Sequence, residues 1–177
     1  NMEVPEGHYL DQNMKSTFVP NRNAIFSSMI YGYSVSIYKR TGNSVRLSLG
    51  VHSGDHLIYP DCRPEFYKQI MKSFEIGNWD SENIEIYLPY INIDKSNIIS
   101  DGIKSCEMLG INYKTIYKNT LTTYSPDKNG YSAGRTGSDI ERILSFNKLG
   151  IEDPGLYLKP WKQLLKHALE SEKNMNI

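Results

Sequence analysis

Two kinds of apolar periodicity alternate along the chain, and this alternation limits the fold more than any other feature of the sequence. Residues 45–51 and 83–88 are short, partly alternating and rich in β-branched residues, which predicts strands. Residues 21–39 and 64–76 repeat apolar side chains at helical spacing. Strands that alternate with helices predict parallel βα units in a three-layer α/β fold. Ligands in such folds bind beyond the carboxyl ends of the strands, where the polar loop at residues 52–63 leaves the first strand.

The rest of the chain is predicted to be helical, apart from one long loop at residues 122–137 that is rich in turn-forming residues. Two strands make a poor sheet, so we expect the remaining strands to be missing or supplied from outside this chain. The predicted helices begin at Asp94 or Ser96, at Ser138, and at Pro154 or Pro160, and they end near residues 108, 149 and 170, with a frayed tail after Ser171.

Composition argues against several functional classes. The 177 residues carry 20 basic and 20 acidic side chains, and this zero formal net charge argues against a nucleic-acid-binding domain held by electrostatics. No apolar segment approaches the roughly 20 residues that cross a membrane, so we expect no membrane contact. We also expect no signal peptide. Two cysteines, Cys62 and Cys106, are too few for a disulfide scaffold, which favours a reducing cytoplasm.

The densest group of reactive side chains lies between Gly50 and Phe66, where two His, two Asp, a Cys, an Arg, a Tyr and a Glu occur together. One interpretation is a plain turn, with Asp55 and Asp61 as caps and Arg63–Glu65 as a surface ion pair. The other is a ligand site at the carboxyl end of the first strand. On spacing alone, both interpretations stay open.

Three blocks of sequence resemble one family. Residues 50–66 read GVHSGDHLIYPDCRPEF, residues 4–26 read VPEGHYLDQNMKSTFVPNRNAIF, and residues 137–157 read GSDIERILSFNKLGIEDPGLY. The first block is similar to the signature of the 7-cyano-7-deazaguanine synthases of the queuosine pathway. The second is similar to their segment ending in Val-Pro-x-Arg-Asn-x-x-Phe, and the third to their carboxy-terminal end. The resemblance covers roughly residues 3–157 in the family's order.

This resemblance implies an ATP-pyrophosphatase fold of the adenine nucleotide alpha-hydrolase type, of which residues 1–157 would form the C-terminal part. Residues 158–177 would add a helix and a tail. The family activates the carboxylate of 7-carboxy-7-deazaguanine with ATP, and ammonia then yields the amide and finally the nitrile. ATP and Mg²⁺ are therefore the implied cofactors.

The resemblance also assigns roles to individual residues. Carboxylates accept hydrogen bonds from the base, and a guanidinium suits a carboxylate or a phosphate. The implied catalytic residues are Asp55, Asp61 and Arg63, the substrate-binding residues are Tyr59, Cys62, Glu65 and His56, and the nucleotide-binding residues are Arg22, Asn23 and Gly50.

Several alternatives to these roles remain open. Arg63 could instead pair with Glu65, and Asn21 or Asn23 could simply cap a helix. Cys62 could be a nucleophile if its pKa were depressed, but a small buried residue is the favoured interpretation. The spacing of the histidines around Asp55 fits no strong zinc pattern, so no metal is predicted there.

The sequence departs from the family in two ways. The family's Ser-Gly-Gly-x-Asp-Ser phosphate loop does not occur here, so we expect weak ATP binding by this chain alone. Pro126, Ala133, Thr136 and Asp139 occupy the positions of the family's four zinc-binding cysteines. Zinc is therefore predicted to be absent, with turns and packing holding the loop and Asp139 capping the helix that follows.

These departures leave three functional hypotheses. The first is a synthase whose phosphate loop is supplied by a partner or by a missing segment. We expect a homodimer, or a complex with a partner that supplies the missing N-terminal half. The second is an antiviral-defence paralogue that adenylates a deazaguanine and transfers it to a protein or another acceptor. The third is a non-catalytic subunit that binds the deazaguanine.

Overall fold

A computed structural model describes residues 4–175 of the chain. The chain divides into two compact units, one formed by Phe18–Asp94 and the other by the segments on either side of it. The predicted boundary between residues 157 and 158 separates the family domain from a C-terminal helix and tail. It differs from this division into compact units and stays a prediction. Within the described residues, no helix combines the length and apolarity needed to cross a membrane.

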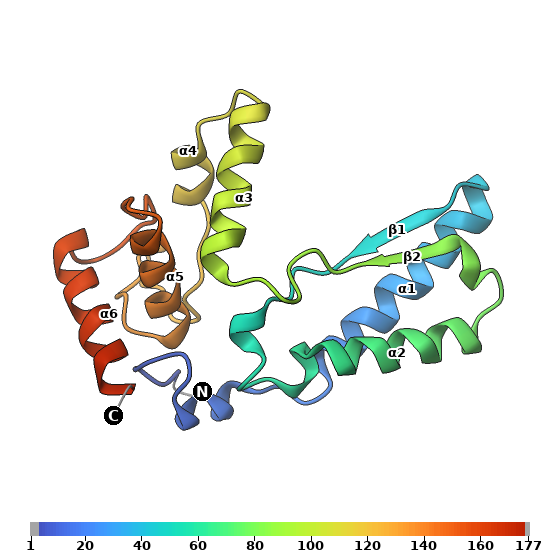
Figure 1. Ribbon diagram of the computed structural model, residues 1–177, viewed down its shortest axis with the longest axis horizontal. Helices are drawn as coiled ribbons and strands as arrows, with labels where there is room; N and C mark the ends of the chain where they lie inside the picture. Colours follow the sequence, from blue (N-terminus) through green and yellow to red (C-terminus); the bar gives the residue numbers. More distant parts are fainter. Residues whose placement is uncertain (1–3, 176–177) are drawn as a thin grey trace. The chain divides into compact units, whose positions relative to one another are not determined.

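The unit Phe18–Asp94 contains α1 (Arg22–Thr41), β1 (Val45–Ser48), α2 (Pro64–Gly77) and β2 (Ile84–Tyr87), in that order (Figure 1). The two strands pair in parallel, from Val45 opposite Ile84 to Ser48 opposite Tyr87. Both predicted strands and the α/β class are thus confirmed. The ladder stops at Ser48 rather than at Val51, because Pro89 lies just beyond β2 and has no N–H to extend it.

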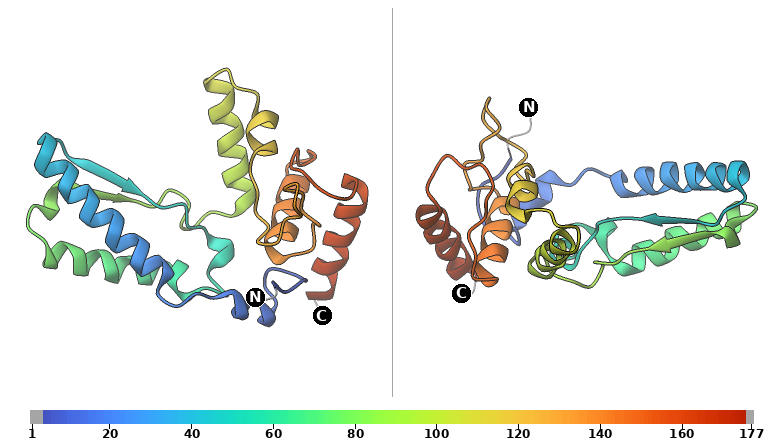
Figure 2. Two further views of the ribbon diagram at one scale, coloured as in Figure 1. Left: turned by 180° about the vertical axis from the view of Figure 1, so that it is seen from behind. Right: turned by 90° about the horizontal axis from the view of Figure 1, so that it is seen from above.

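The core of this unit lies on one face of the sheet. Leu47 and Ile84 point to that face with Tyr31 of α1, and all three are less than a tenth exposed. Phe74 of α2 packs against the Tyr31 ring with the centroids 5.0 Å apart, so both helices cover the same face, as Figure 2 shows alongside the strands. The described residues therefore form two of the three predicted layers.

The second unit is helical. It contains α3 (Lys95–Met108), α4 (Tyr113–Lys118), α5 (Gly137–Lys148) and α6 (Trp161–Met175), preceded by a 3₁₀ turn at Gln12–Thr17. Ile140 and Ile143 of α5 are fully buried against Leu164 and Ala168 of α6.

Helix ends in this unit differ from the predictions in three places. Helix α4 was not predicted, because six residues that begin after the capping side chain of Asn112 carry too short a periodic pattern. Helix α5 is capped by Thr136 rather than Ser138, since Asp139 completes a capping box with Thr136. Helix α6 continues to Met175, past the predicted frayed start at Ser171.

Replacing Leu47 by Ala is expected to lower the free energy of unfolding by about 2–4 kcal/mol, because it leaves a cavity between the sheet and α1. The matched control is Ile76→Ala, since Ile76 is 77% exposed. That change is expected to stay within about 0.5 kcal/mol of the unsubstituted protein. Urea unfolding followed by circular dichroism measures both, and equal effects of the two substitutions would show that this core is wrongly placed.

Candidate functional site

The polar loop after β1 folds back onto the start of α1. It contains two single-turn 3₁₀ segments, Ser53–Asp55 and Pro60–Cys62, and the second leads directly into α2 at Pro64. Pro60 and Pro64 each suit the first position of their helical turn, because proline has no N–H to leave unpaired there. The loop thereby places residues 59–62 against residues 22 and 23.

Asp61 caps α1 from a distant part of the chain. Asn21 occupies the N-cap position with a left-handed φ of 60°, and its side chain makes no capping bond. Oδ2 of Asp61 instead accepts a hydrogen bond from the backbone N–H of Asn23, at 3.3 Å and across 38 residues of sequence. A carboxylate is favourable there because the N-terminus of a helix carries partial positive charge.

The side chain of Asn23 links the two sequence blocks. Its Nδ2 donates to the backbone oxygen of Asp61 at 3.1 Å and to Sγ of Cys62 at 3.3 Å. Both amide hydrogens are engaged by these bonds, and the backbone N–H is held by the Asp61 carboxylate. The N–H groups of Asn23 thus hold the loop, and its predicted contact with a nucleotide stays a prediction.

Cys62 is a buried thiol, only 3% exposed. The pKa of Cys62 is raised to about 12, mainly by burial and also by the negative charges of Asp55 and Asp61, whereas the Asn23 hydrogen bond and the charge of Arg22 lower it. A thiol with this pKa stays neutral near pH 7 and is a poor nucleophile. The structure thus favours the small buried residue over the nucleophile.

Arg22 and Tyr59 lie together at the same end of α1. The guanidinium carbon of Arg22 is 5.8 Å from the centre of the Tyr59 ring, within the range of a cation–π contact. Tyr67, which was not predicted, is buried beside this group at 2% exposure. Burial raises the pKa of Tyr67, as do the charges of Cys62 and Asp61, while Arg22 lowers it. The one sequence signal for placing Tyr67 near this group was its helical spacing, four residues after Arg63.

A second pair lies earlier in the loop. His52 is buried, its Nδ1 accepts a hydrogen bond from the N–H of Gly54, and its Nε2 is 3.4 Å from Oδ2 of Asp55. The contact with His52 holds the Asp55 side chain in place. Across residues 4–175, no group of three or more His, Cys, Asp or Glu side chains is arranged to hold a metal ion.

The remaining predicted residues lie at the edge of this group. Arg63 and Glu65 are exposed, and Nε of Arg63 donates to the backbone oxygen of His56 at 2.7 Å. No ion pair joins Arg63 to Glu65 in the described part of the chain, so that alternative is wrong. Gly50 is exposed at the end of the β1 segment.

Two buried polar atoms of the loop have no hydrogen-bond partner. They are Oδ1 of Asp61 and Nε2 of His56. Buried polar groups are nearly always paired, so each such atom needs an explanation such as an ordered water or a ligand. Asp61 is only 6% exposed, which makes its Oδ1 a desolvated acceptor beside the positive end of α1.

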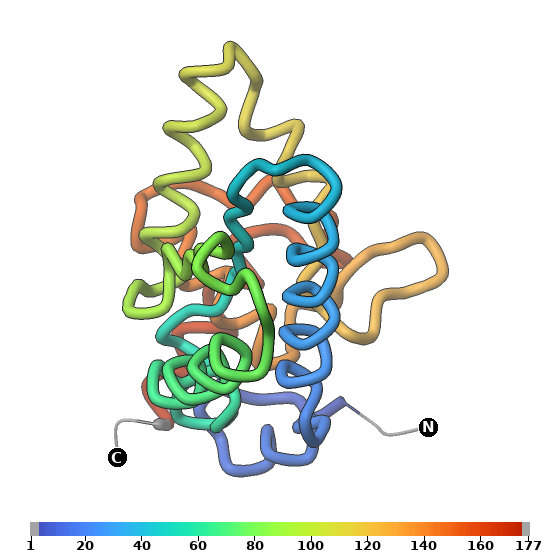
Figure 3. The backbone as a smooth tube through the Cα atoms, turned by 90° about the vertical axis from the view of Figure 1, so that its right-hand side faces the viewer, coloured from blue at the N-terminus to red at the C-terminus, as the bar shows by residue number. Residues whose placement is uncertain are grey.

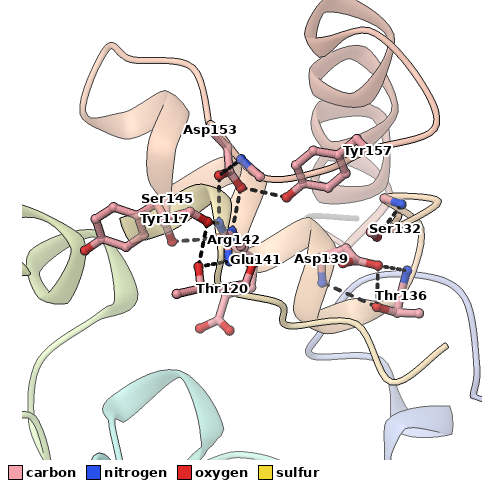
Figure 4. Close-up of polar contacts among 12 residues, drawn as sticks. Tyr117, Thr120, Ser132, Thr136, Asp139, Glu141, Arg142, Ser145, Asp153 and Tyr157 are labelled. Carbon is pink, nitrogen blue, oxygen red and sulfur yellow. Dashed lines mark hydrogen bonds and ion pairs between the residues drawn. The ribbon is translucent and has the colours of Figure 1, made fainter. Parts of the chain in front are cut away.

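The loop aligned with the family's zinc site belongs to the other unit. Pro126 and Ala133 are exposed, whereas Thr136 and Asp139 are buried. The Thr136 hydroxyl donates to Oδ2 of Asp139 at 2.7 Å, and the Thr136 backbone N–H donates to the same oxygen at 3.3 Å (Figure 4). The prediction that Asp139 caps the following helix is confirmed only in part: Thr136 is the N-cap, and Asp139 takes part in the cap from the third position of the helix.

Hydrogen-bonded turns close the rest of this loop. Oδ1 of Asp127 accepts from the N–H groups of Asn129 and Tyr131, at 2.9 and 2.8 Å, and forms the turn that projects in Figure 3. The hydroxyl of buried Ser132 accepts from the N–H of Gly134 at 2.9 Å.

A buried ion pair joins two parts of the third sequence block, the Glu-Arg segment and the Glu-Asp-Pro segment. Arg142 bonds Asp153 through two nitrogens, at 2.6 and 2.8 Å, and also donates to the backbone oxygens of Tyr117 and Thr120 (Figure 4). The hydroxyl of Tyr157 donates to Asp153 at 2.6 Å. Burial pulls the pKa of Arg142 down, but the bond and charge of Asp153 outweigh it and raise the pKa overall. Arg142 thus stays charged, and the pair is fully hydrogen-bonded.

Comparison with known proteins gives one family. The family model described as queuosine biosynthesis protein QueC matches residues 1–150. The chain is 40% identical over 153 residues to 7-cyano-7-deazaguanine synthase 1 of Colwellia psychrerythraea, covering 86% of this chain and 62% of that protein. Synthase 2 of the same organism is 42% identical over 156 residues, covering 88% and 64%.

A relative from a different bacterium agrees. The 7-cyano-7-deazaguanine synthase of Caldicellulosiruptor saccharolyticus is 40% identical over 152 residues, covering 85% of this chain and 60% of that protein. The chain therefore spans less than two thirds of the length of these relatives. No solved structure matches the chain. All three relatives carry the name 7-cyano-7-deazaguanine synthase.

Cys62 is expected to react slowly with iodoacetamide. In a Cys106→Ala variant at pH 8, where a free thiol of pKa about 8.5 is partly ionised, alkylation should be at least about tenfold slower than for free cysteine. The raised pKa also means that the neutral thiol stabilises the fold below pH 9, and that this stabilisation is lost as the pH rises from 9 towards 12. Mass spectrometry measures the rate, and alkylation as fast as that of free cysteine would contradict the buried neutral thiol.

Proposed function

Because the chain belongs to the family of queuosine biosynthesis protein QueC, we propose that it carries out ATP-dependent synthesis of 7-cyano-7-deazaguanine from 7-carboxy-7-deazaguanine and ammonia. The observation that supports this most directly is the junction of the two family blocks. Asn23 of one block holds Asp61 and Cys62 of the other, and a desolvated carboxylate oxygen results at the carboxyl end of β1.

The proposed chemistry solves a reactivity problem. A carboxylate is a poor electrophile, so one of its oxygens first attacks the α-phosphorus of ATP and releases pyrophosphate. Ammonia then displaces AMP from the acyl-adenylate and gives the primary amide. The amide oxygen then attacks the α-phosphorus of a second ATP and releases a second pyrophosphate, and loss of AMP and a proton from nitrogen gives the nitrile. The site must keep water from the acyl-adenylate throughout.

Asp61 is the proposed acceptor for the deazaguanine base. Its Oδ1 is buried and has no partner, and an ionised carboxylate accepts hydrogen bonds only. The N–H groups of a guanine-type base are the matching donors. Asp55, held by His52, and Tyr59 lie in the same loop and are proposed to contact the same base.

The cations of the site are proposed to face the anions of the reaction. Arg63 uses Nε within the loop, and its two Nη groups remain for the substrate carboxylate or an ATP phosphate. Arg22, over the Tyr59 ring, is proposed to contact a phosphate. The substrate site is also proposed to be lined by Glu65, His56 and Cys62. Gly50 is proposed to let the nucleotide approach the backbone closely.

Mg²⁺ is proposed to accompany ATP and to neutralise charge on its phosphates. Mg²⁺ in such sites needs only one or two protein carboxylates, because phosphates and waters fill the other positions. Asp55 and Asp61 are the proposed acceptors for the base, so Mg²⁺ is proposed to be held mainly by the ATP phosphates and by waters. The expected homodimer, or complex with a partner, stays a prediction.

The Asp61→Asn substitution tests the base acceptor. The amide oxygen can still accept from the N–H of Asn23, so the cap on α1 is kept, whereas alanine would remove it and cost about 1 kcal/mol. We expect the substitution to weaken binding of 7-carboxy-7-deazaguanine by at least about tenfold, since bonds to charged groups contribute about 1.5–3 kcal/mol. Calorimetry measures binding, and chromatography measures nitrile formation, with protein expressed from the complete reading frame.

Glu82→Gln is the matched control, because Glu82 is an exposed carboxylate in the same unit and lies outside the proposed site. It should leave both binding and turnover unchanged. Unaltered binding in Asp61→Asn would remove the assignment of Asp61. Nitrile formation that is absent even in the unsubstituted protein would overturn the proposed activity.

We also propose that the loop at residues 126–139 closes without zinc. Its support is the capping box of Thr136 and Asp139 together with the turns at Asp127 and Ser132. Elemental analysis of purified protein should find well under one zinc per chain. A strong chelator should leave the midpoint of thermal unfolding unchanged, whereas a relative with all four cysteines should lose stability. One tightly bound zinc per chain would contradict the proposal.

A further inference from the structure

A cavity of about 370 Å³ lies between α6 and the segment at residues 133–135. Both walls belong to the unit that contains α5 and α6 (Figure 1). Gly134 makes the close approach possible: its φ is +72°, and any side chain there would collide with Leu164 of α6. The cavity is lined by Ala133, Gly134, Arg135, Leu158, Lys159, Gln163, Leu164 and His167.

The side chains around this cavity carry one sign of charge. Arg135, Lys159 and His167 offer cationic or N–H groups, and Gln163 adds an amide, while no carboxylate lines the cavity. Arg135 does contact Glu6, but at 3.5 Å with both side chains more than half exposed. Such a surface pair contributes little and leaves Arg135 available to another anion.

His167 also lines the cavity, and its side chain is only partly buried. Its Nε2 is buried and has no hydrogen-bond partner. In the protonated ring, or in the tautomer with hydrogen on Nε2, this atom is a donor without an acceptor. The first two turns of α6, at the positive end of that helix, form the same wall and favour an anion further.

We propose that this cavity is a binding site for a small oxyanion, the phosphate or carboxylate group of a small molecule. The volume fits a small ligand, and Leu158, Leu164 and Ala133 provide an apolar surface for its carbon atoms. A half-open cavity of this size, in a chain with zero net charge, fits a small ligand better than a nucleic-acid backbone. The site is not implied by the family match, because α6 lies beyond residue 150 where that match ends.

Titration with inorganic phosphate, and separately with propionate, tests the site. Trp161 opens α6 and reports through its fluorescence, in a Trp79→Phe background that removes the other tryptophan, which is 88% exposed. We expect saturable binding of at least one of the two anions, and the stronger ligand identifies whether the site takes phosphate or carboxylate. Circular dichroism verifies that each variant is folded.

The Lys159→Gln and His167→Gln variants should each weaken binding by about tenfold or more, because a charge-assisted bond is lost. Lys162→Gln is the matched control, since Lys162 is an exposed lysine of the same helix that does not line the cavity. Absence of saturable binding in the unsubstituted protein would overturn the proposal. An equal loss in Lys162→Gln would also overturn it, because it would show diffuse attraction to a basic surface instead of a site.

Discussion

The contact between the Asp61 carboxylate and the N-terminus of α1 is the interaction on which the candidate site depends. It places a negative charge where the helix carries partial positive charge, and it joins parts of the chain 38 residues apart. Asn23 locks the same junction through its side chain, so that Arg22 reaches Tyr59. The same contact leaves the second carboxylate oxygen of Asp61 buried without a hydrogen-bond partner. This oxygen is therefore available to accept a hydrogen bond.

The other unit relies on a different charge. Arg142 contacts Asp153, the carbonyl group of Tyr117 in α4 and the carbonyl group of Thr120 after it, so one buried guanidinium ties three segments together. A buried ion pair is stabilising only when its remaining donors are also satisfied, and here the backbone oxygens of Tyr117 and Thr120 satisfy them. The capping box at Thr136 completes the loop. Directional hydrogen bonds can thus hold a loop for which thiolate ligands are lacking.

Sequence reasoning located the site better than it assigned the individual roles. The grouping of Asp55, Tyr59 and Asp61 beyond the first strand follows from the strand's position, because parallel strands present their carboxyl ends at one edge. The structural role of Asn23 was not predicted, because its partners lie in another block of sequence. Tyr67 was missed, because its helical spacing from Arg63 does not distinguish a tyrosine beside the loop from one that fills a core.

The sequence alone determined the periodic elements, the parallel α/β class and the family, because periodicity and motif spacing are properties of residues that are close along the chain. Tertiary structure alone decided that the Cys62 thiol is neutral, that Asp61 rather than Asn21 caps α1, and that Arg142 pairs with Asp153. Burial and hydrogen-bond partners set these outcomes, and both come from residues that meet only when distant segments pack together.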